Sequence, residues 1–176
     1  MTSGTLHDTG RLIARARWLE ERCFEILGGW VVTTSDPEAK LLLARQSHHH
    51  AWHAELFGRV LPRANGLDLA SDTAVDVREW VEFLDQLAAT TGSVDRVVGV
   101  FDLLVPRKLA EYERWRDGSD PVRDAPVLRW LQFVIADESA DLTEGRALLA
   151  GRPATAPTPA QAALRSALDR AGDLLS

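Results

Sequence analysis

Two carboxylates, Glu138 and Asp141, interrupt the apolar face of a long helix predicted in the last third of the chain. At about 100° per residue, the apolar stripe of this segment contains Val127, Leu131 and Val134, and both carboxylates fall inside it. Their spacing of three residues points both side chains into one small volume. A buried carboxylate stays ionised only beside a metal ion, a basic side chain or a shared proton. The sequence therefore predicts a cation partner at this position.

Two further predicted helices also place charged residues on their inward faces. Glu20 shares an arc with Leu19 in the first helix, and Lys108 and Glu111 share an arc with Leu104 in another. Carboxylates from three helices then converge on the core. An ion pair between Lys108 or Arg129 and the carboxylates is one interpretation, and a metal site is the other.

The histidines of the chain are concentrated in one helical segment. Four of the five, His48, His49, His50 and His53, fall within six residues. At helical spacing His49 and His53 share one face, and His50 and His53 lie within reach of each other. Imidazole nitrogen is a common metal ligand, so His50 and His53 are candidate ligands. A pH-responsive surface is a separate hypothesis, because four close imidazoles repel one another once protonated.

The elements that must position these residues are all helical, and strand signals are nearly absent. Pro106 predicts a kink or break inside the fourth helix, and Ser35 or Asp36 followed by Pro37 predicts the start of the second. Long helices joined by short loops favour an antiparallel four-helix bundle, with the third helix as a crossover or side element. The predicted helices span residues 6–33, 37–61, 72–90, 93–117, 126–150 and 160–175.

The predicted organisation is a bundle over residues 1–151, a proline-rich linker over 152–159 and a C-terminal amphipathic helix within 160–176. The 176 residues suffice for one domain with a real core, and the net charge of −6 argues against a nucleic-acid partner. The single cysteine, Cys23, excludes an intrachain disulfide and a cysteine-based zinc site. No apolar run approaches about 18 residues and no signal peptide is evident, so we expect a cytoplasmic protein without a membrane span.

Taken together, the pattern resembles the ferritin-like superfamily, and in particular its short bacterial members. In that family a four-helix bundle holds two metal ions, with one Glu from each of two helices and a Glu-x-x-His motif from each of the other two. Glu20, the histidine-rich segment, Glu111 and the run Asp137-Glu138-x-x-Asp141 occur in the matching helix order. The resemblance covers about residues 6–150.

The resemblance implies a centre with two iron or manganese ions, and an oxygen-dependent oxidase or hydroxylase. The substrate would be a small molecule or a carrier-bound intermediate. Carboxylates neutralise and bridge such cations, while imidazoles leave positions open for dioxygen. The ligands implied for the centre are Glu20, His50, His53, Glu111, Glu138 and Asp141.

The sequence also departs from the family pattern. Asp141 stands where the motif has His, and the second helix has no Glu-x-x-His. Lys108 lies one turn before Glu111 and places an ammonium where a cation would sit. The alternative is therefore a metal-free bundle that acts as a binding or homodimerisation module. Its buried ion network would consist of Lys108, Glu111, Glu138 and Asp141.

Overall fold

The computed structural model describes residues 6–63, 77–153 and 156–175, and within these ranges every regular element is a helix. This confirms the predicted all-α class. None of the described helices has the length and hydropathy that a membrane crossing requires. The elements are α1 (Leu6–Val31), α2 (Pro37–Val60), α4 (Arg78–Ala88), α5 (Ser93–Val98), the π-helical segment η1 (Gly99–Leu104), α6 (Val105–Gly118), α7 (Ala125–Ala150) and α8 (Pro159–Ala171).

Capping residues supplied by the sequence fix the starts of α2 and α8. Asp36, one of the two predicted caps, accepts a hydrogen bond at Oδ1 from the Ala39 N–H at 2.9 Å, and Pro37 opens the helix. Thr158 caps α8 in a reciprocal capping box with Gln161. Each cap satisfies backbone N–H groups that the first helical turn leaves without partners.

Three helices end at least two residues before the predicted position. The first helix ends at Val31 rather than residue 33, because the N–H groups of Thr33 and Thr34 turn back to the Trp30 carbonyl. The last helix ends at Ala171 rather than 175, since Gly172 takes a positive φ of 65°. Residues 72–76 of the predicted third helix lie outside the described residues, and α4 ends at Ala88.

The structure accommodates Pro106 without a break, since α5, η1 and α6 follow one another without a gap. Proline lacks the N–H that would bond one helical turn back. Just before it the helix widens, and the Val105 N–H bonds the Val100 carbonyl five residues earlier. This wider turn determines which way the side chains of α6 point, Lys108 included.

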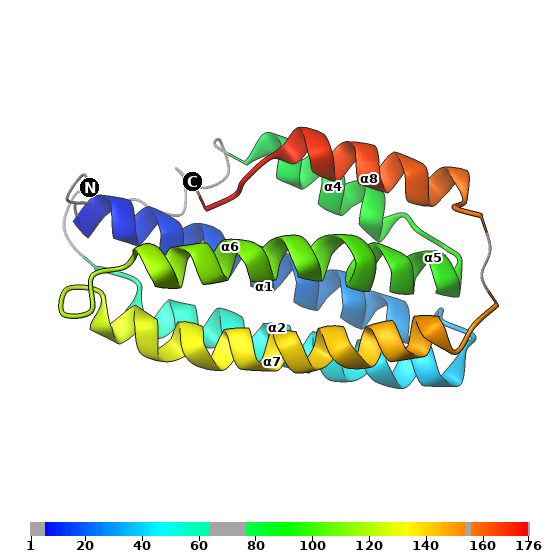
Figure 1. The fold of residues 1–176 in the computed structure, drawn as a ribbon, viewed down its shortest axis with the longest axis horizontal. Coiled ribbons are helices and arrows are strands. Elements are labelled where there is room, and N and C mark those ends of the chain that lie inside the picture. The colour runs from blue at the N-terminus through cyan, green and yellow to red at the C-terminus, as the bar shows by residue number, and fades with distance from the viewer. Residues whose placement is uncertain (1–5, 64–76, 154–155, 176) are drawn as a thin grey trace.

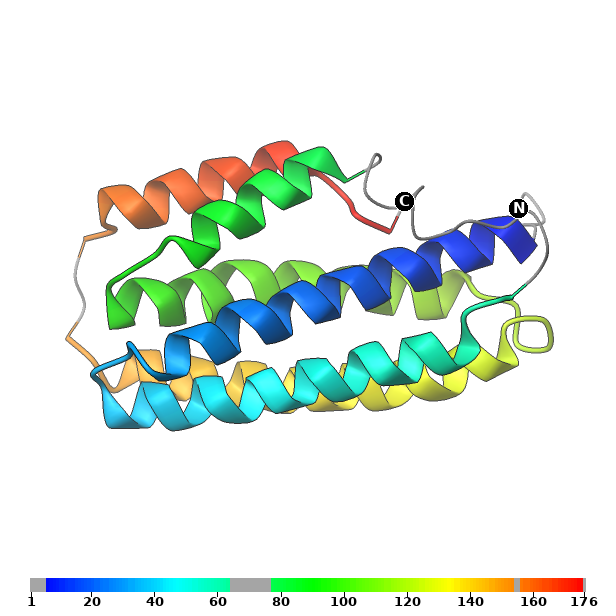
Figure 2. The same cartoon turned by 180° about the vertical axis from the view of Figure 1, so that it is seen from behind.

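The four long helical stretches α1, α2, α5–η1–α6 and α7 lie side by side along the long axis of the molecule, as Figures 1 and 2 show. The shorter helices α4 and α8 lie against each other on one side of this group. The helix that the sequence predicts over 72–90 is therefore, in its described part, a side element. The C-terminal helix packs with α4 and η1 in a shared apolar core.

The apolar core consists of two clusters, and a polar layer lies between them. The first cluster includes Leu104 on η1, and partly buried Leu142 of α7 packs against it. The second cluster includes Trp115 on α6 and Ile135 on α7. Each helix thus passes from one cluster to the other, and the residues in between include Lys108 on α6 and Glu138 on α7. The buried polar residues at this level are Glu20, His50, His53, Lys108 and Glu138.

A close contact between η1 and α7 lies beside this layer. Gly145 is buried on α7, and a Cβ atom at this position would lie 2.1 Å from ring carbons of Phe101. Phe101 is itself completely buried, so its ring has no room to withdraw. The absence of a side chain at Gly145 therefore sets how closely η1 approaches α7.

We expect Gly145→Ala to destabilise the protein by about 1–3 kcal/mol, because overpacking at the Phe101 ring outweighs the helix propensity gained. Gly29→Ala is the control, since this exposed helical glycine has nothing within 4 Å of the added carbon. That variant should be stabilised by about 0.5–1 kcal/mol. Thermal and urea unfolding followed by circular dichroism measure both. Equal stabilisation of the two variants would contradict the tight contact.

Candidate metal centre

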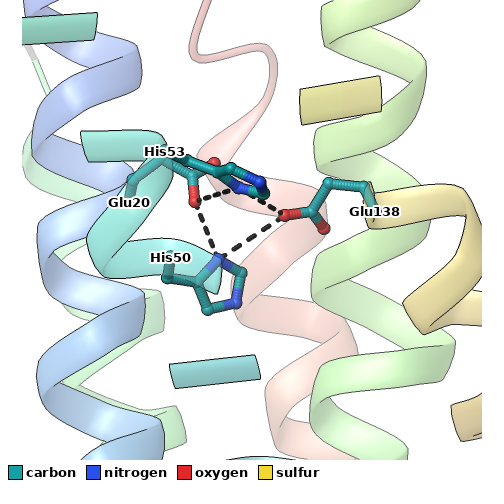
Figure 3. Close-up of side chains that lie close together, drawn as sticks. All are labelled: Glu20, His50, His53 and Glu138. Atoms are coloured by element: carbon teal, nitrogen blue, oxygen red, sulfur yellow. Dashed lines mark hydrogen bonds and ion pairs between the residues drawn. The ribbon is translucent and has the colours of Figure 1, made fainter. Parts of the chain in front are cut away.

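Four buried side chains from three helices converge at the middle of the molecule. Glu20 comes from α1, His50 and His53 come from successive turns of α2, and Glu138 comes from α7. Figure 3 shows the two carboxylates and the two imidazole rings facing a common point. One nitrogen or oxygen atom of each residue lies within 4.8 Å of the others, a grouping that could hold a metal ion.

The distances within this cluster match the spacing of ligands around one ion. His53 Nδ1 lies 3.4 Å from Glu20 Oε2 and 3.4 Å from Glu138 Oε1. His50 Nδ1 lies 3.5 Å from Glu138 Oε1, whereas its 2.7 Å to Glu20 Oε2 is a hydrogen-bond distance. Ligands at about 2.1 Å from a tetrahedral ion are separated by about 3.4 Å. Three of these four separations are therefore long for a hydrogen bond but suited to ligands of one ion.

Asp137 orients the His53 ring from outside the cluster. Its Oδ2 lies 3.2 Å from His53 Nε2, on the side of the ring away from the carboxylates of the cluster. A carboxylate that holds the second nitrogen of a histidine fixes the tautomer of a metal ligand. A His53 ring that loses its Nδ1 proton would keep the proton on Nε2 and turn the Nδ1 lone pair toward Glu20 and Glu138.

Several buried atoms around the cluster lack a hydrogen-bond partner. They are His53 Nδ1, His50 Nε2, Glu138 Oε2 and both side-chain amide atoms of Gln46, which lies one turn before His50 on α2. Buried polar atoms in folded proteins nearly always have partners. The orphaned His53 nitrogen and Glu138 oxygen are both atom types that coordinate divalent metals, so the residues present fit a metal ion.

Lys108 and Tyr112, both completely buried or nearly so, approach the cluster from α6. Lys108 Nζ donates to Glu138 Oε1 at 2.6 Å, lies 3.1 Å from Glu20 Oε1 and lies 3.2 Å from His50 Nδ1. Tyr112 donates its hydroxyl proton to Glu20 Oε1 at 2.5 Å. Glu20 therefore uses one oxygen for α6 and presents the other to the histidines.

Electrostatics keep both carboxylates ionised although they are buried. Burial by itself raises the pKa of Glu20, but the Lys108 ammonium and His50 outweigh it and hold that pKa well below the usual range. Burial opposes ionisation of Glu138 as well, and Lys108 and His53 lower its pKa to about 2. The two negative charges are thus a fixed property of the folded interior.

The same fields act on the groups that face the carboxylates. Burial disfavours the charged form of His53, but the surrounding carboxylates of Asp137, Glu138 and Glu20 favour it more and raise its pKa to about 11. Burial likewise opposes the charge on Lys108, and the two carboxylates raise its pKa above the usual value. Without a metal, the ammonium and the protonated imidazole therefore balance the charges of Glu20 and Glu138.

The structure does not bring two of the predicted ligands to the cluster. Glu111 faces the end of the chain instead, where its Oε2 accepts the N–H groups of Leu174 and Leu175 at 2.9 Å each. Asp141 lies 2.7 Å from His49 Nδ1. Neither residue is within the ion network of Lys108, which instead consists of Glu20, Glu138, His50 and Tyr112.

The remaining predicted residues have other surroundings. Arg129 lies over the ring of Trp130 at 5.5 Å, not beside the carboxylates. His48 is exposed and His49 partly exposed, whereas His50 and His53 are buried. The histidines thus do not share one surface.

Sequence reasoning assigned no role to Tyr112, Asp137 or Gln46. Tyr112 carried a usable signal, since it follows Lys108 by four residues and so shares its helical face. Asp137 precedes Glu138 directly, and neighbouring residues on a helix point about 100° apart, so no helical wheel places both at one site. Both residues nevertheless contact His53, because the ring faces Asp137 with Nε2 and Glu138 with Nδ1.

Comparisons with protein-family models, with curated proteins and with solved structures find no match to this chain.

Two surface cavities, of about 760 Å³ beside α8 and about 510 Å³ between α1 and α2, are lined by residues other than the cluster. The buried cluster is therefore the feature of the described residues that points to a function.

The buried position of Glu111 predicts a pH effect on stability. Burial raises its pKa to about 6, from an ordinary value of 4.5, despite the bonds from Leu175 and Leu174. The protonated form is favoured by folding, so this contribution to stability is present below about pH 4.5 and is lost as the pH rises through about 6.

Glu111→Gln does not titrate and should escape that loss. Relative to the unaltered protein, the variant should gain about 1–2 kcal/mol between about pH 4.5 and pH 7. Urea unfolding across this range measures the difference in free energy of unfolding between the two proteins. The contributions of the other titrating groups are the same in both proteins and cancel in this difference. A difference that is constant with pH would contradict the assignment.

Proposed function

We propose that this chain binds one redox-active divalent ion, iron or manganese, through Glu20, His50, His53 and Glu138, and acts as an oxygen-dependent oxidoreductase. The observation that carries the proposal is the buried His53 Nδ1 atom. It has no hydrogen-bond partner, it lies 3.4 Å from an oxygen of each of two buried carboxylates, and Asp137 holds its opposite nitrogen. A metal ion supplies the partner that all three groups require.

The donor set supports an ion of this class. Two carboxylates and two imidazoles offer hard oxygen and borderline nitrogen donors, which suit iron(II), manganese(II) and zinc(II) better than copper(I). Because Glu111 and Asp141 lie elsewhere, the ligands that the resemblance assigns to a second ion are not present here. We therefore propose one ion rather than two.

The arrangement of the helices also supports a ferritin-like bundle. The ligands come from the first, second and last of the four long stretches, and Lys108 comes from the third, at the depth where the resemblance places metal ligands. The first two assignments, Glu20 and the histidine-rich segment, follow the helix order that the resemblance implies. The third stretch contributes an ammonium in place of a carboxylate.

The burial of the cluster restricts what can react there. Glu20, His50, His53 and Glu138 are each completely buried, so a reactant at the cluster must be small. Dioxygen and hydrogen peroxide meet this requirement, and a single ion of variable valence would supply one electron to either, which an external electron donor would have to replace in each turnover. Around it, Tyr112 holds Glu20 with its hydroxyl proton, and Asp137 links His53 to solvent. The chain's own residues thus provide a proton at each end of the cluster.

Metal binding tests the proposal directly. Protein purified without an affinity tag and incubated with manganese(II) or iron(II) without air should hold one ion per chain, as counted by mass spectrometry. Glu138→Gln should reduce the affinity about 100-fold or more, because it removes a ligand and its charge. Asp141→Asn, one turn along the same face of α7, is the matched control and should bind as the unaltered protein does.

Two results would contradict the proposed ligands: stoichiometric metal retained in Glu138→Gln, or metal lost in Asp141→Asn. For the proposed reaction, the iron-loaded protein should consume dioxygen in an oxygen electrode, and the Glu138→Gln variant should not. Metal binding without oxygen consumption would support the metal site but contradict the proposed oxidoreductase activity.

The pKa of His53 predicts how binding depends on pH. With a pKa of about 11, the ring is protonated throughout the neutral range and must lose a proton before Nδ1 can coordinate. The apparent affinity should rise about tenfold per pH unit between about pH 6.5 and 8. Calorimetric titration in buffers with different protonation enthalpies counts the protons released. Affinity independent of pH would show that His53 is not a ligand.

The position of Lys108 favours a second candidate, a metal-free bundle in which the ammonium is the permanent cation. Its Nζ already lies within 3.2 Å of an atom in each of Glu20, His50 and Glu138. In this case the chain would act through binding at its surface. Protein that takes up no metal in any form, with a melting temperature unaffected by metal or chelator, would favour this candidate over the first.

A further inference from the structure

Lys108 touches the very atoms that a metal would need. The proposed ligand atoms are Glu20 Oε2, His50 Nδ1, His53 Nδ1 and Glu138 Oε1, according to the distances within the cluster. Lys108 Nζ lies 2.6 Å from Glu138 Oε1 and 3.2 Å from His50 Nδ1. Two of the four donor atoms are therefore already in contact with a cation.

The contact with His50 is the more restrictive of the two. Lys108 Nζ, which has three N–H donors and no lone pair, can only donate in this contact, whereas His50 Nδ1 can itself donate to Glu20 Oε2 at 2.7 Å. Either the nitrogen accepts from the ammonium or it carries a proton shared with Glu20, and in both cases its lone pair is occupied. A neutral imidazole nitrogen offers one lone pair in the ring plane, and coordination to a metal needs that same lone pair. His50 Nδ1 cannot accept from the ammonium and bind a metal ion at once.

Charge leads to the same conclusion. An ion about 2.1 Å from Glu138 Oε1 and from His50 Nδ1 would lie next to the ammonium, because both atoms already contact Nζ. Such an arrangement places three positive charges against the two carboxylates in an interior without water. The metal ion and the Lys108 ammonium would repel each other strongly at such a short distance in the interior. Either cation alone is held by the carboxylates without this repulsion.

We propose that Lys108 is an internal competitor for the metal, so that the cluster holds either the ammonium or the ion but not both. This inference rests on the proposed metal site and specifies what determines its affinity. The lysine side chain has four rotatable bonds and can withdraw along α6 when an ion enters. The metal-free protein remains folded because Lys108 balances the carboxylates, and the metal must displace it in order to bind.

Replacing the ammonium by an apolar side chain of similar length tests the competition. Lys108→Met should bind cobalt(II), used as a coloured probe, about tenfold or more tightly than the unaltered protein. Folding should also become metal-dependent. Removing the metal with chelator should lower the melting temperature of the variant by many degrees and that of the unaltered protein by less, because Lys108 still balances the carboxylates of the unaltered protein once the ion has left. Lys108→Arg keeps the charge and is the matched control, with no gain in affinity.

The unaltered chain offers a second measurement that does not depend on any variant folding. Its only lysines are Lys40 and Lys108, so protein labelled with carbon-13 at the lysine ε position gives two signals in nuclear magnetic resonance. Lys40 is partly exposed on α2, and Lys108 is buried. Adding zinc(II), a diamagnetic probe, should shift the Lys108 signal and leave the Lys40 signal in place.

The outcomes separate this inference from the proposed function. Weaker binding in Lys108→Met, with an unmoved Lys108 signal, would overturn the competition and make the ammonium a supporting partner of a genuine metal site. Binding by Lys108→Met alone would support the competition and overturn the metal function of the unaltered chain. No binding by either protein would overturn both.

Discussion

Two carboxylates enclosed in an apolar interior are the constraint on which the rest of this structure depends. Glu20 and Glu138 are both inaccessible to solvent, and the interior penalises each negative charge by several kcal/mol unless a cation is close. Lys108 supplies that cation at 2.6 Å from Glu138 and 3.1 Å from Glu20. The helices α1, α6 and α7 must therefore stay in register with one another, because a shift of one turn would separate the charges.

The polar layer also explains why the core is divided into two clusters. Lys108 lies between Leu104, in the first cluster, and Trp115, in the second. Its direction depends on the π-helical segment before Pro106, which rotates α6 relative to α5. The contact between Phe101 and Gly145 then holds that segment against α7, the helix that carries Glu138. The π-helical segment and the absence of a side chain at Gly145 thus position the two helices that carry the Lys108–Glu138 ion pair.

The sequence was sufficient to predict the helices and the inward faces of α1 and α7, because regular helices keep a constant rotation per residue. Glu20 and Glu138 were identified in this way. Glu111 was predicted on the same arc of α6 as Lys108, and both side chains are buried. Because they are three residues apart, they point about 60° apart, so Lys108 reaches the cluster whereas Glu111 meets the chain end. Tyr112, one turn after Lys108, reaches the cluster with it.

Asp141 illustrates a finer limit of the same reasoning. It follows Glu138 by three residues, a rotation of about 300°, so the two point about 60° apart on one side of α7. That difference suffices to aim Asp141 at His49 rather than at the cluster. A helical wheel can place a residue on the inward side of its own helix. Which partner that residue contacts also depends on how the neighbouring helix is rotated about its axis, and the sequence of α7 does not specify that rotation. For the same reason, the sequence of α2 alone does not decide which of His48, His49, His50 and His53 faces the core.

Stability alone gives a poor account of the polar layer. Buried ion pairs are often no more stabilising than apolar residues of the same volume, and can be less so. This chain nevertheless places two carboxylates, two imidazoles, an ammonium and a phenol at one level of its core. Charge balance requires the Lys108 ammonium and one protonated imidazole, but not two imidazoles, and it does not require buried ring nitrogens without hydrogen-bond partners, as at His53 Nδ1 and His50 Nε2. The histidines become intelligible if a second cation alternates with the first, because imidazole nitrogen coordinates a metal ion and an ammonium does not require it.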